Sequence, residues 1–155
     1  MPQFSTKRRV RHAADDMFEL VADMERYPEF VPLCQNMKVR RRTPLDGGGE
    51  VVISEMTVAY KMIRETFTTR VMLDRPHLNI FVEYLDGPFS WLENRWNFRA
   101  TSERASEVEF FISYEFKSRI LGLVMGAMFD TAFRRFSDAF ERRADRIFAA
   151  RKVQT

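Results

Sequence analysis

Few side chains in this sequence are of the kinds that transform a substrate or hold a metal ion. The two histidines are His12, at the end of an alternating segment, and His77, in a turn signal, and the single cysteine is Cys34. A zinc site needs several Cys, His or carboxylate ligands at short spacing, and a nucleophilic cysteine needs a base beside it. Neither pattern occurs, so we predict surface histidines, a small buried thiol, no metal site, no cofactor and no catalytic residue.

One carboxylate has a distinctive position. Glu65 shares the side of its predicted strand with Ile63 and Phe67, and a carboxylate on an apolar face must find a partner or shift its pKa. An inward arginine or Asn94 is the first candidate partner, and a polar group of a ligand is the second. Because no second acid or base is placed beside Glu65, the sequence points to binding rather than to turnover.

Hydrophobic periodicity predicts the elements that position these residues. Residues 3–12 alternate as a strand, residues 13–24 carry a helical stripe, and residues 26–34, RYPEFVPLC, hold two prolines that permit only a short, broken second helix. Residues 35–117 alternate between turn signals, which predicts about six antiparallel strands with one apolar face. From residue 120 onward the period becomes 3.6, which predicts a helix long enough to cross the whole sheet.

Length and composition predict one soluble globular domain over residues 1–155. A chain of 155 residues with 45% hydrophobic and 30% charged residues can bury a core or enclose a cavity. The longest uncharged apolar run, residues 120–129, is about half of what a bilayer crossing needs, and the first residues lack the apolar stretch of a signal peptide. We expect a cytoplasmic protein, with peripheral attachment to the inner membrane as the alternative.

The net charge of +3 is unevenly distributed. Basic residues gather at 7–11, at 38–42 and on the C-terminal segment. Such clusters can bind anionic lipid headgroups or RNA phosphates, although a solvated face is the simpler interpretation. The candidate membrane or RNA surface consists of Arg134, Arg142, Arg143 and Arg146, and Arg135, Arg151 and Lys152 extend the same cluster.

The apolar residues are more informative than the polar ones. The chain contains 15 Phe, 9 Met, 4 Tyr and 2 Trp, which predicts either a filled core or the lining of a pocket. A long helix laid across a strongly curved sheet tends to leave space beneath it. Flexible methionines and large aromatic side chains are suited to line such a space.

Several motifs occur in order along nearly the whole chain. They are D-x-E-x-Y-P-E-F-V-P-x-C at 23–34, I-R-E and F-T-T-R within 63–70, G-P-F-S-W-L-E-N-R-W-N-F at 87–98, F-x-I-x-Y-E-F-K at 110–117, and F-x-x-A-F-x-x-R with A-F-E-x-R-A within 129–144. Together they resemble the coenzyme-Q-binding group of the START-like superfamily, which also includes polyketide cyclases. Bacterial members of this group include ribosome-association toxins.

The resemblance implies an α+β helix-grip fold of order β-α-α-β6-α, in which a curved antiparallel sheet wraps around a long C-terminal helix. It also implies a hydrophobic tunnel that holds ubiquinone or another lipid, so that the protein is a quinone chaperone supporting respiration and is not an enzyme. Leu33 departs from the aromatic residue expected in many relatives, which leaves the shape of the tunnel mouth open. Besides Glu65, the expected ligand-binding residues are Tyr27, Phe30, Val31 and Leu33 at the mouth, Phe67, Trp91, Trp96, Phe98 and Tyr114 on the sheet, and Met125, Phe129 and Phe136 on the helix.

Two other functions remain open from the sequence. A ribosome-associated regulator would use the basic clusters on the RNA phosphates of the large subunit. A cyclase or dehydrase would use the same fold for catalysis, because fold alone does not decide function. We expect no DNA partner under any of these hypotheses.

Overall fold

The computed structural model describes the backbone of residues 3–153 and the side chains of residues 3–148. The helices are α1 (Ala14–Ala22), the 3-10 helix η1 (Met24–Glu29) and α2 (Arg119–Val153). The strands are β1 (Gln3–Val10), β2 (Cys34–Pro44), β3 (Gly49–Tyr60), β4 (Ile63–Asp74), β5 (Asn79–Asp86), β6 (Phe89–Ser102) and β7 (Ala105–Phe116). This order confirms the expected helix-grip fold, β-α-α-β6-α.

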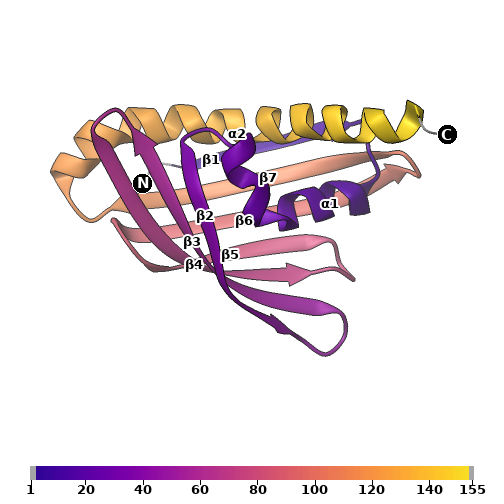
Figure 1. Ribbon diagram of the computed structural model, residues 1–155, viewed down its shortest axis with the longest axis horizontal. Coiled ribbons are helices and arrows are strands. Elements are labelled where there is room, and N and C mark those ends of the chain that lie inside the picture. The colour runs from indigo at the N-terminus through magenta and orange to yellow at the C-terminus, as the bar shows by residue number, and fades with distance from the viewer. Residues whose placement is uncertain (1–2, 154–155) are drawn as a thin grey trace.

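The strands form one curved antiparallel sheet in the described part of the chain, with the order β1-β7-β6-β5-β4-β3-β2. Strands β2 to β7 form a meander, in which each strand pairs with the next one along the chain. The last strand, β7, also pairs with β1, so that Gln3 lies opposite Ser113 and Val10 opposite Ser106. Helix α2 runs along the length of the sheet (Figure 1). The fold is therefore two layers, with the core between the sheet and its helices.

Period-two alternation places one face of the sheet against the helices. In β4, Phe67, Val71 and Leu73 are buried, whereas Arg70 and Met72 are exposed. Strand β6 does not keep a constant alternation, because its register with β7 shifts between Phe89 and Trp91. Such a bulge moves the side chains that follow it to the other face.

The turn between β5 and β6 requires a glycine. Gly87 has a φ of +141°, and a Cβ atom at this position would lie 2.5 Å from the Cβ of Phe67. A residue with a side chain would be strained there and would also displace Phe67. One of the turn signals in the sequence, D-G-P at 86–88, therefore coincides with a tight turn that packs closely against β4.

Helix α2 packs on the sheet through one broad stripe. Met125, Phe129, Phe133, Phe140 and Ala144 are buried at helical spacing. The helix begins after Ser118, whose Oγ accepts hydrogen bonds from the backbone N–H groups of the next turn, at 3.1 and 3.3 Å. No helix among residues 3–153 has a stretch long and apolar enough to span a bilayer.

The two histidines differ in environment. His77 is exposed, as expected, and its Nδ1 lies 2.9 Å from Oδ2 of Asp74. The expected surface position of His12 is wrong, because its side chain is buried and its Nε2 lies 2.7 Å from Oδ1 of Asp145. Arg8 adds a hydrogen bond of 2.9 Å to Glu141, so polar contacts tie the beginning of the chain to α2.

Candidate functional site

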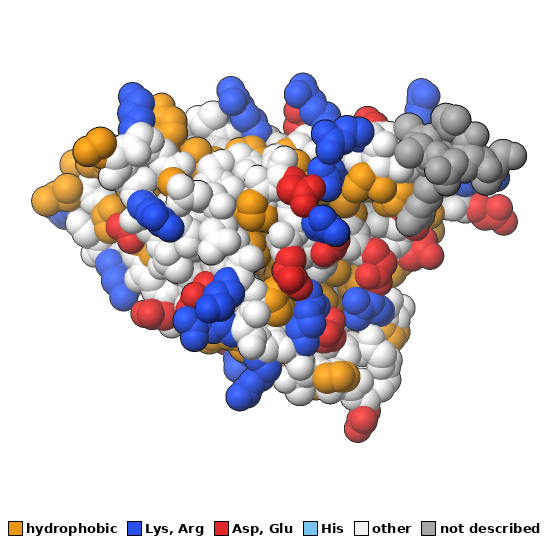
Figure 2. Space-filling view, viewed as in Figure 1, with side chains coloured by type: hydrophobic (Ala, Val, Ile, Leu, Met, Phe, Trp, Pro, Cys, Tyr) orange, Lys and Arg blue, Asp and Glu red, His pale blue; other side chains and the backbone are white. Residues whose placement is uncertain are grey.

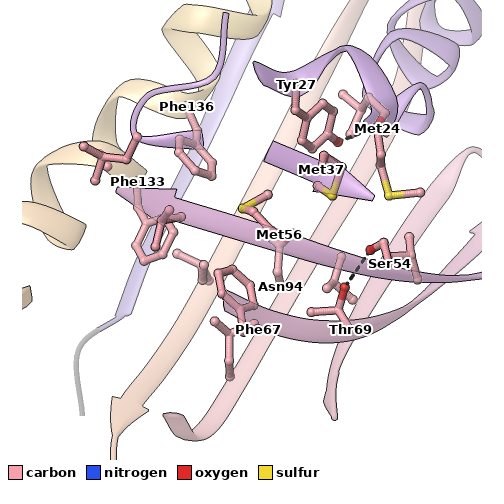
Figure 3. Close-up of a pocket in the computed structure, with 18 of the residues that line it drawn as sticks. Met24, Tyr27, Met37, Ser54, Met56, Phe67, Thr69, Asn94, Phe133 and Phe136 are labelled. Atoms are coloured by element: carbon pink, nitrogen blue, oxygen red, sulfur yellow. Dashed lines mark hydrogen bonds between the residues drawn. The ribbon is translucent and has the colours of Figure 1, made fainter. Parts of the chain in front are cut away.

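An apolar cavity lies between the sheet and α2 (Figure 3). The space within it that the centre of a water molecule can occupy is about 80 Å³. The cavity is therefore narrow. The wall consists of Val21, Met24, Tyr27, Pro32 and Leu33 from α1, η1 and the following loop, of Met37, Ser54, Met56, Val58, Phe67, Thr69, Val71, Ile80, Val82, Leu92, Asn94, Trp96 and Ile112 from the sheet, and of Phe129, Ala132, Phe133, Phe136 and Phe140 from α2.

The polar groups in this wall are hydroxyls and one amide. Ser54 and Thr69 face each other across β3 and β4, and their hydroxyls are hydrogen-bonded at 3.1 Å. Asn94 donates from Nδ2 to the carbonyl of Phe111 at 2.8 Å and accepts at Oδ1 from Nε1 of Trp96 at 3.1 Å. Each of these side chains therefore has a partner, as buried polar groups require.

Tyr27, a residue of η1, forms part of the cavity wall. Its hydroxyl donates to the carbonyl of Val21, and its ring makes edge contacts with Phe30 at 6.1 Å and Phe140 at 5.3 Å between centroids. Burial raises the pKa of Tyr27, so the phenol stays neutral at physiological pH. Pro28 lies within η1, and the short 3-10 turn that results holds Tyr27 against the cavity.

The structure brings part of the predicted site together. The predicted residues that line the cavity are Tyr27, Leu33, Phe67, Trp96, Phe129 and Phe136. Leu33 reaches it from a backbone with a φ of 67°, a conformation uncommon for a residue with a side chain. The mouth, the sheet and the helix thus each contribute some of the residues expected from them.

Other predicted residues lie behind the wall. Val31, Phe98 and Met125 are buried in the core and do not line the cavity. Tyr114 packs against Phe133 at 5.1 Å between centroids, and burial raises its pKa to about 12. Phe30 lies outside the cavity and covers Tyr27 and Phe140.

Two predictions fail on side-chain environment. Trp91 is 44% exposed and donates from Nε1 to the hydroxyl of Ser113 at 3.2 Å, because the bulge in β6 turns it away from the cavity. Glu65 does lie on the inward side of β4 and is half-buried, but it does not line the cavity. Its carboxylate has no hydrogen-bond partner among the described residues, so the expected pairing with an inward arginine or with Asn94 is wrong.

Sequence reasoning expected methionines in the wall without assigning Met37 or Met56 to it, and it missed the hydroxyls. Met37, Met56, Ser54 and Thr69 all line the cavity. A signal for the hydroxyls was present, because Thr69 shares the parity of Phe67 and Val71 in an otherwise apolar strand face. A small polar residue at an inward position indicates either a buried pair or a ligand contact.

In the described part of the chain, the cavity wall lacks the side chains that most often act as an acid, a base or a metal ligand. The described residues that form the wall include no His, Cys, Lys, Arg, Asp or Glu. Nor do the described residues outside the wall contain a group of three His, Cys, Asp or Glu side chains that could hold a metal ion. Cys34 is buried, as predicted, and burial raises its pKa to about 11. Its thiol therefore stays protonated and unreactive at neutral pH.

A second hollow, the arginine groove, lies on the outer surface where η1 meets α2. Its volume is about 370 Å³, and it is lined by Phe30, Pro32, Arg135, Asp138, Ala139, Arg142, Arg143 and Arg146. Arg142 pairs with Asp138 at 3.1 Å, whereas Arg135 and Arg146 make no ion pair with the described residues.

The predicted arginines differ in role. Arg143 is only 10% exposed, donates to Glu29 at 2.7 Å and lies over the Phe30 ring at 5.1 Å, so it holds η1 against α2. Arg134 lies outside the groove, pairs with Asp130 and covers Phe4. The side chains of Arg151 and Lys152 lie outside the described residues.

Comparisons with known proteins agree with this geometry. A family model described as "Polyketide cyclase / dehydrase and lipid transport" matches residues 10–141. The protein named "Ribosome association toxin RatA" of Escherichia coli (strain K12) is 32% identical over 151 residues, which cover 97% of this chain and 92% of that protein. The protein named "Coenzyme Q-binding protein COQ10, mitochondrial" of Drosophila melanogaster is 28% identical over 141 residues, which cover 88% of this chain and 56% of that protein.

Solved structures have the same fold. The 18 kDa protein CC1736 from Caulobacter crescentus superposes with a TM-score of 0.76 at 34% identity, over 96% of this chain and 99% of that one. A START superfamily protein from Mycobacterium smegmatis gives 0.77 at 18% identity, over 94% and 98%. The Zhui aromatase/cyclase from Streptomyces sp. R1128 gives 0.72 at 19% identity, over 94% of each chain, and at this distance the likeness shows the fold alone.

Proposed function

This chain belongs to the polyketide cyclase/dehydrase and lipid transport family, and we propose that it binds a polyprenyl quinone such as ubiquinone, or a closely related lipid, in the cavity beneath α2. It carries this ligand as a chaperone in support of respiration and does not transform it. The observation that carries the proposal is the apolar wall, whose only ionisable side chain among the described residues is the neutral Tyr27.

The composition of the wall suits a long, flexible apolar ligand. Met24, Met37 and Met56 surround the free space together with Phe133 and Phe136 (Figure 3). Methionine side chains have several rotatable bonds and can repack around different shapes. Because the free space is narrow, the ligand must displace some of these side chains as it enters.

The hydroxyl pair supports a ligand with a carbonyl group. Two hydroxyls that bond to one another use one hydrogen and leave the other free to donate, so Ser54 or Thr69 can bind a quinone oxygen. Figure 3 shows this pair on one side of the cavity and Phe133 and Phe136 on the other. The quinone ring would lie at the hydroxyls and the isoprenoid tail along the phenylalanines.

The same wall argues against catalysis. Cyclisation and dehydration of polyketides require proton transfer, which a positioned acid or base performs. Hydroxyl and amide side chains can orient a ligand, but their pKa values lie far from neutral pH, which makes them weak general acids and bases. We therefore prefer a carrier, although the fold is shared with an aromatase/cyclase and the relatives are named as a toxin and a coenzyme Q-binding protein.

Mass spectrometry of the lipids that purify with the protein tests the proposal. We expect organic extracts of protein made in quinone-producing cells to contain a polyprenyl quinone in near-stoichiometric amount. Extracts without quinone, together with no binding when quinone is added, would contradict it. Turnover of an aromatic polyketide would support the enzyme instead.

A second candidate function is association with the large ribosomal subunit, which the arginine groove favours. Arg135, Arg142 and Arg146 lie on one side of α2, and two of them have no ion pair with the described residues. Arginines in this state can replace the counterions of RNA phosphates. Phe30 lines the same groove, where its ring lies beneath the Arg143 guanidinium.

Charge reversal distinguishes this candidate. We expect Arg135→Glu/Arg142→Glu/Arg146→Glu to weaken cosedimentation with large subunits at low salt by at least about tenfold, because attraction to phosphates becomes repulsion. Arg143 is left unchanged because it is buried against Glu29. Lys61→Glu/Arg64→Glu/Arg104→Glu is the control, with the same change of charge at exposed positions outside the three basic clusters. Wild-type protein absent from ribosomal fractions would remove the candidate.

A further inference from the structure

One end of the molecule carries large apolar side chains that no described residue covers. At the tip between β3 and β4, Met62 is 98% exposed, and on the first turns of α2, Ile120, Leu123 and Val124 are 73%, 84% and 55% exposed. The tip and the start of α2 lie at the same end of the long axis, on the left of Figure 1. Hydrophobic side chains gather at this end in Figure 2. We call these four residues the apolar end.

The first turns of α2 are apolar on all sides. Residues 120–129 contain no charged residue. Met125 and Phe129 face the core, while Ile120, Leu123 and Val124 face outward. Further along the same helix the outward positions hold Arg134, Arg135, Arg142 and Arg146. A helix that is apolar on all sides is normally buried on its outer side as well. We therefore expect the outer side of this segment to contact another apolar surface.

Basic residues flank both parts of the apolar end. Lys61 and Arg64 lie beside Met62, and Lys117 and Arg119 precede Ile120. All of these cations are exposed, and none makes an ion pair with the described residues. Arg119 also begins α2, whose first turn contains no acidic residue, although the helix dipole favours a negative charge there. The arrangement is therefore unfavourable in the isolated protein and becomes favourable beside a negatively charged partner.

We propose that the apolar end docks on an anionic lipid bilayer. The exposed side chains enter the boundary between headgroups and acyl chains, and the flanking cations lie on the headgroups. A second copy of this chain fits less well, because a two-fold contact would bring the same cations together. The inference rests on the proposed function, because a carrier of a membrane quinone must meet the bilayer.

An aromatic contact lies between the apolar end and the cavity, where β7 meets α2. Phe129 lines the cavity and also contacts Phe116, the last residue of β7, at 5.4 Å between ring centroids. A hollow of about 370 Å³ separates this part of α2 from β7, with Gly122 and Gly126 in its wall. A Cβ atom at Gly122 would meet only Phe116, at 3.9 Å, and one at Gly126 would meet nothing. Docking thus places the loosely packed start of α2, and not residues 26–34, against the membrane.

Vesicle flotation tests the docking surface. With vesicles of phosphatidylethanolamine and phosphatidylglycerol, we expect wild-type protein to float and Met62→Gln/Leu123→Gln to partition at least about tenfold less, because burial of two apolar side chains is lost. The matched control, Leu45→Gln/Met72→Gln, changes two exposed apolar residues away from this end and should float like the wild type. Neutral phosphatidylcholine vesicles should retain less wild-type protein.

Three results would overturn the inference. They are wild-type protein that does not float with anionic vesicles, a Met62→Gln/Leu123→Gln variant that floats as well as the wild type, and light scattering that shows a wild-type dimer which this variant dissociates. Binding of a short-chain quinone in solution separates the two proposals. Wild-type protein that floats but binds no quinone supports docking and contradicts the quinone carrier, whereas a protein that binds quinone but does not float contradicts docking alone.

Discussion

Ala132→Trp is expected to abolish quinone binding while the protein stays folded. Ala132 is buried on α2 and faces the cavity, whose free space is only about 80 Å³. An indole at this position occupies that space and part of the volume of neighbouring side chains. Overpacking of this kind typically costs about 1–3 kcal/mol of stability, which a protein of this size should tolerate.

The measurement is the amount of lipid that purifies with the variant, together with binding of added quinone. Ala127→Trp is the matched control, because it places the same side chain on an exposed position of the same helix. We expect this control to retain its lipid. If Ala132→Trp binds quinone fully, the ligand lies elsewhere. If both variants lose quinone binding, the substitutions have a general effect on α2.

Phe89→Ala is expected to cause the largest loss of stability. The Phe89 ring lies within 4.8 to 6.0 Å, between centroids, of the rings of Phe67, Tyr84, Tyr114, Phe116 and Phe129. It thereby joins β6 to three other strands and to α2. Truncation of a fully buried phenylalanine costs about 3–5 kcal/mol, which corresponds to a fall in Tm of about 10 °C.

Thermal and urea unfolding measure this effect. The control is Phe81→Ala, because Phe81 is only partly buried and its ring is covered by Arg95 at 5.6 Å. We expect this control to lose about 1 kcal/mol or less. Equal losses in the two variants would mean that the aromatic cluster around Phe89 is not central to the core.

The fold could be predicted because its periodicities are long and regular. Strand β4 alternates over its length, with Phe67, Val71 and Leu73 on the buried side, and α2 keeps a helical stripe from Met125 to Ala144. Turn signals such as D-G-P at 86–88 also coincide with real turns, and Gly87 shows why. Each of these features depends on residues close in sequence, which a sequence displays directly.

The site could be predicted only in part, because cavity walls depend on distant contacts. Trp91 was assigned to the cavity, but a bulge in β6 turns it outward, and no residue type announces that bulge. His12 was expected at the surface, but its partner, Asp145, comes from the far end of the chain. Phe30 and Tyr27 were both assigned to the mouth of the tunnel, yet only Tyr27 lines the cavity, and the Phe30 ring covers Tyr27 from outside.

The basic cluster at 38–42 also has a structural explanation. These residues lie on β2, which is an edge of the sheet. Arg40 pairs with Glu55, and Arg42 reaches Glu25 and Glu50. Long charged side chains on an edge strand hinder pairing with the strands of other molecules. The cluster therefore protects the sheet without any need for a nucleic acid partner.

The pairing of β1 with β7 sets an order of events during synthesis. Strand β1 leaves the ribosome before the other strands of the sheet, but its neighbours in the sheet, residues 106–113, are made much later. Its other anchors, Glu141 for Arg8 and Asp145 for His12, come later still. Contacts between residues so far apart in sequence form slowly. Strand β1 must therefore remain unpaired until β7 and much of α2 have emerged, and the nascent protein is most exposed to aggregation during that interval.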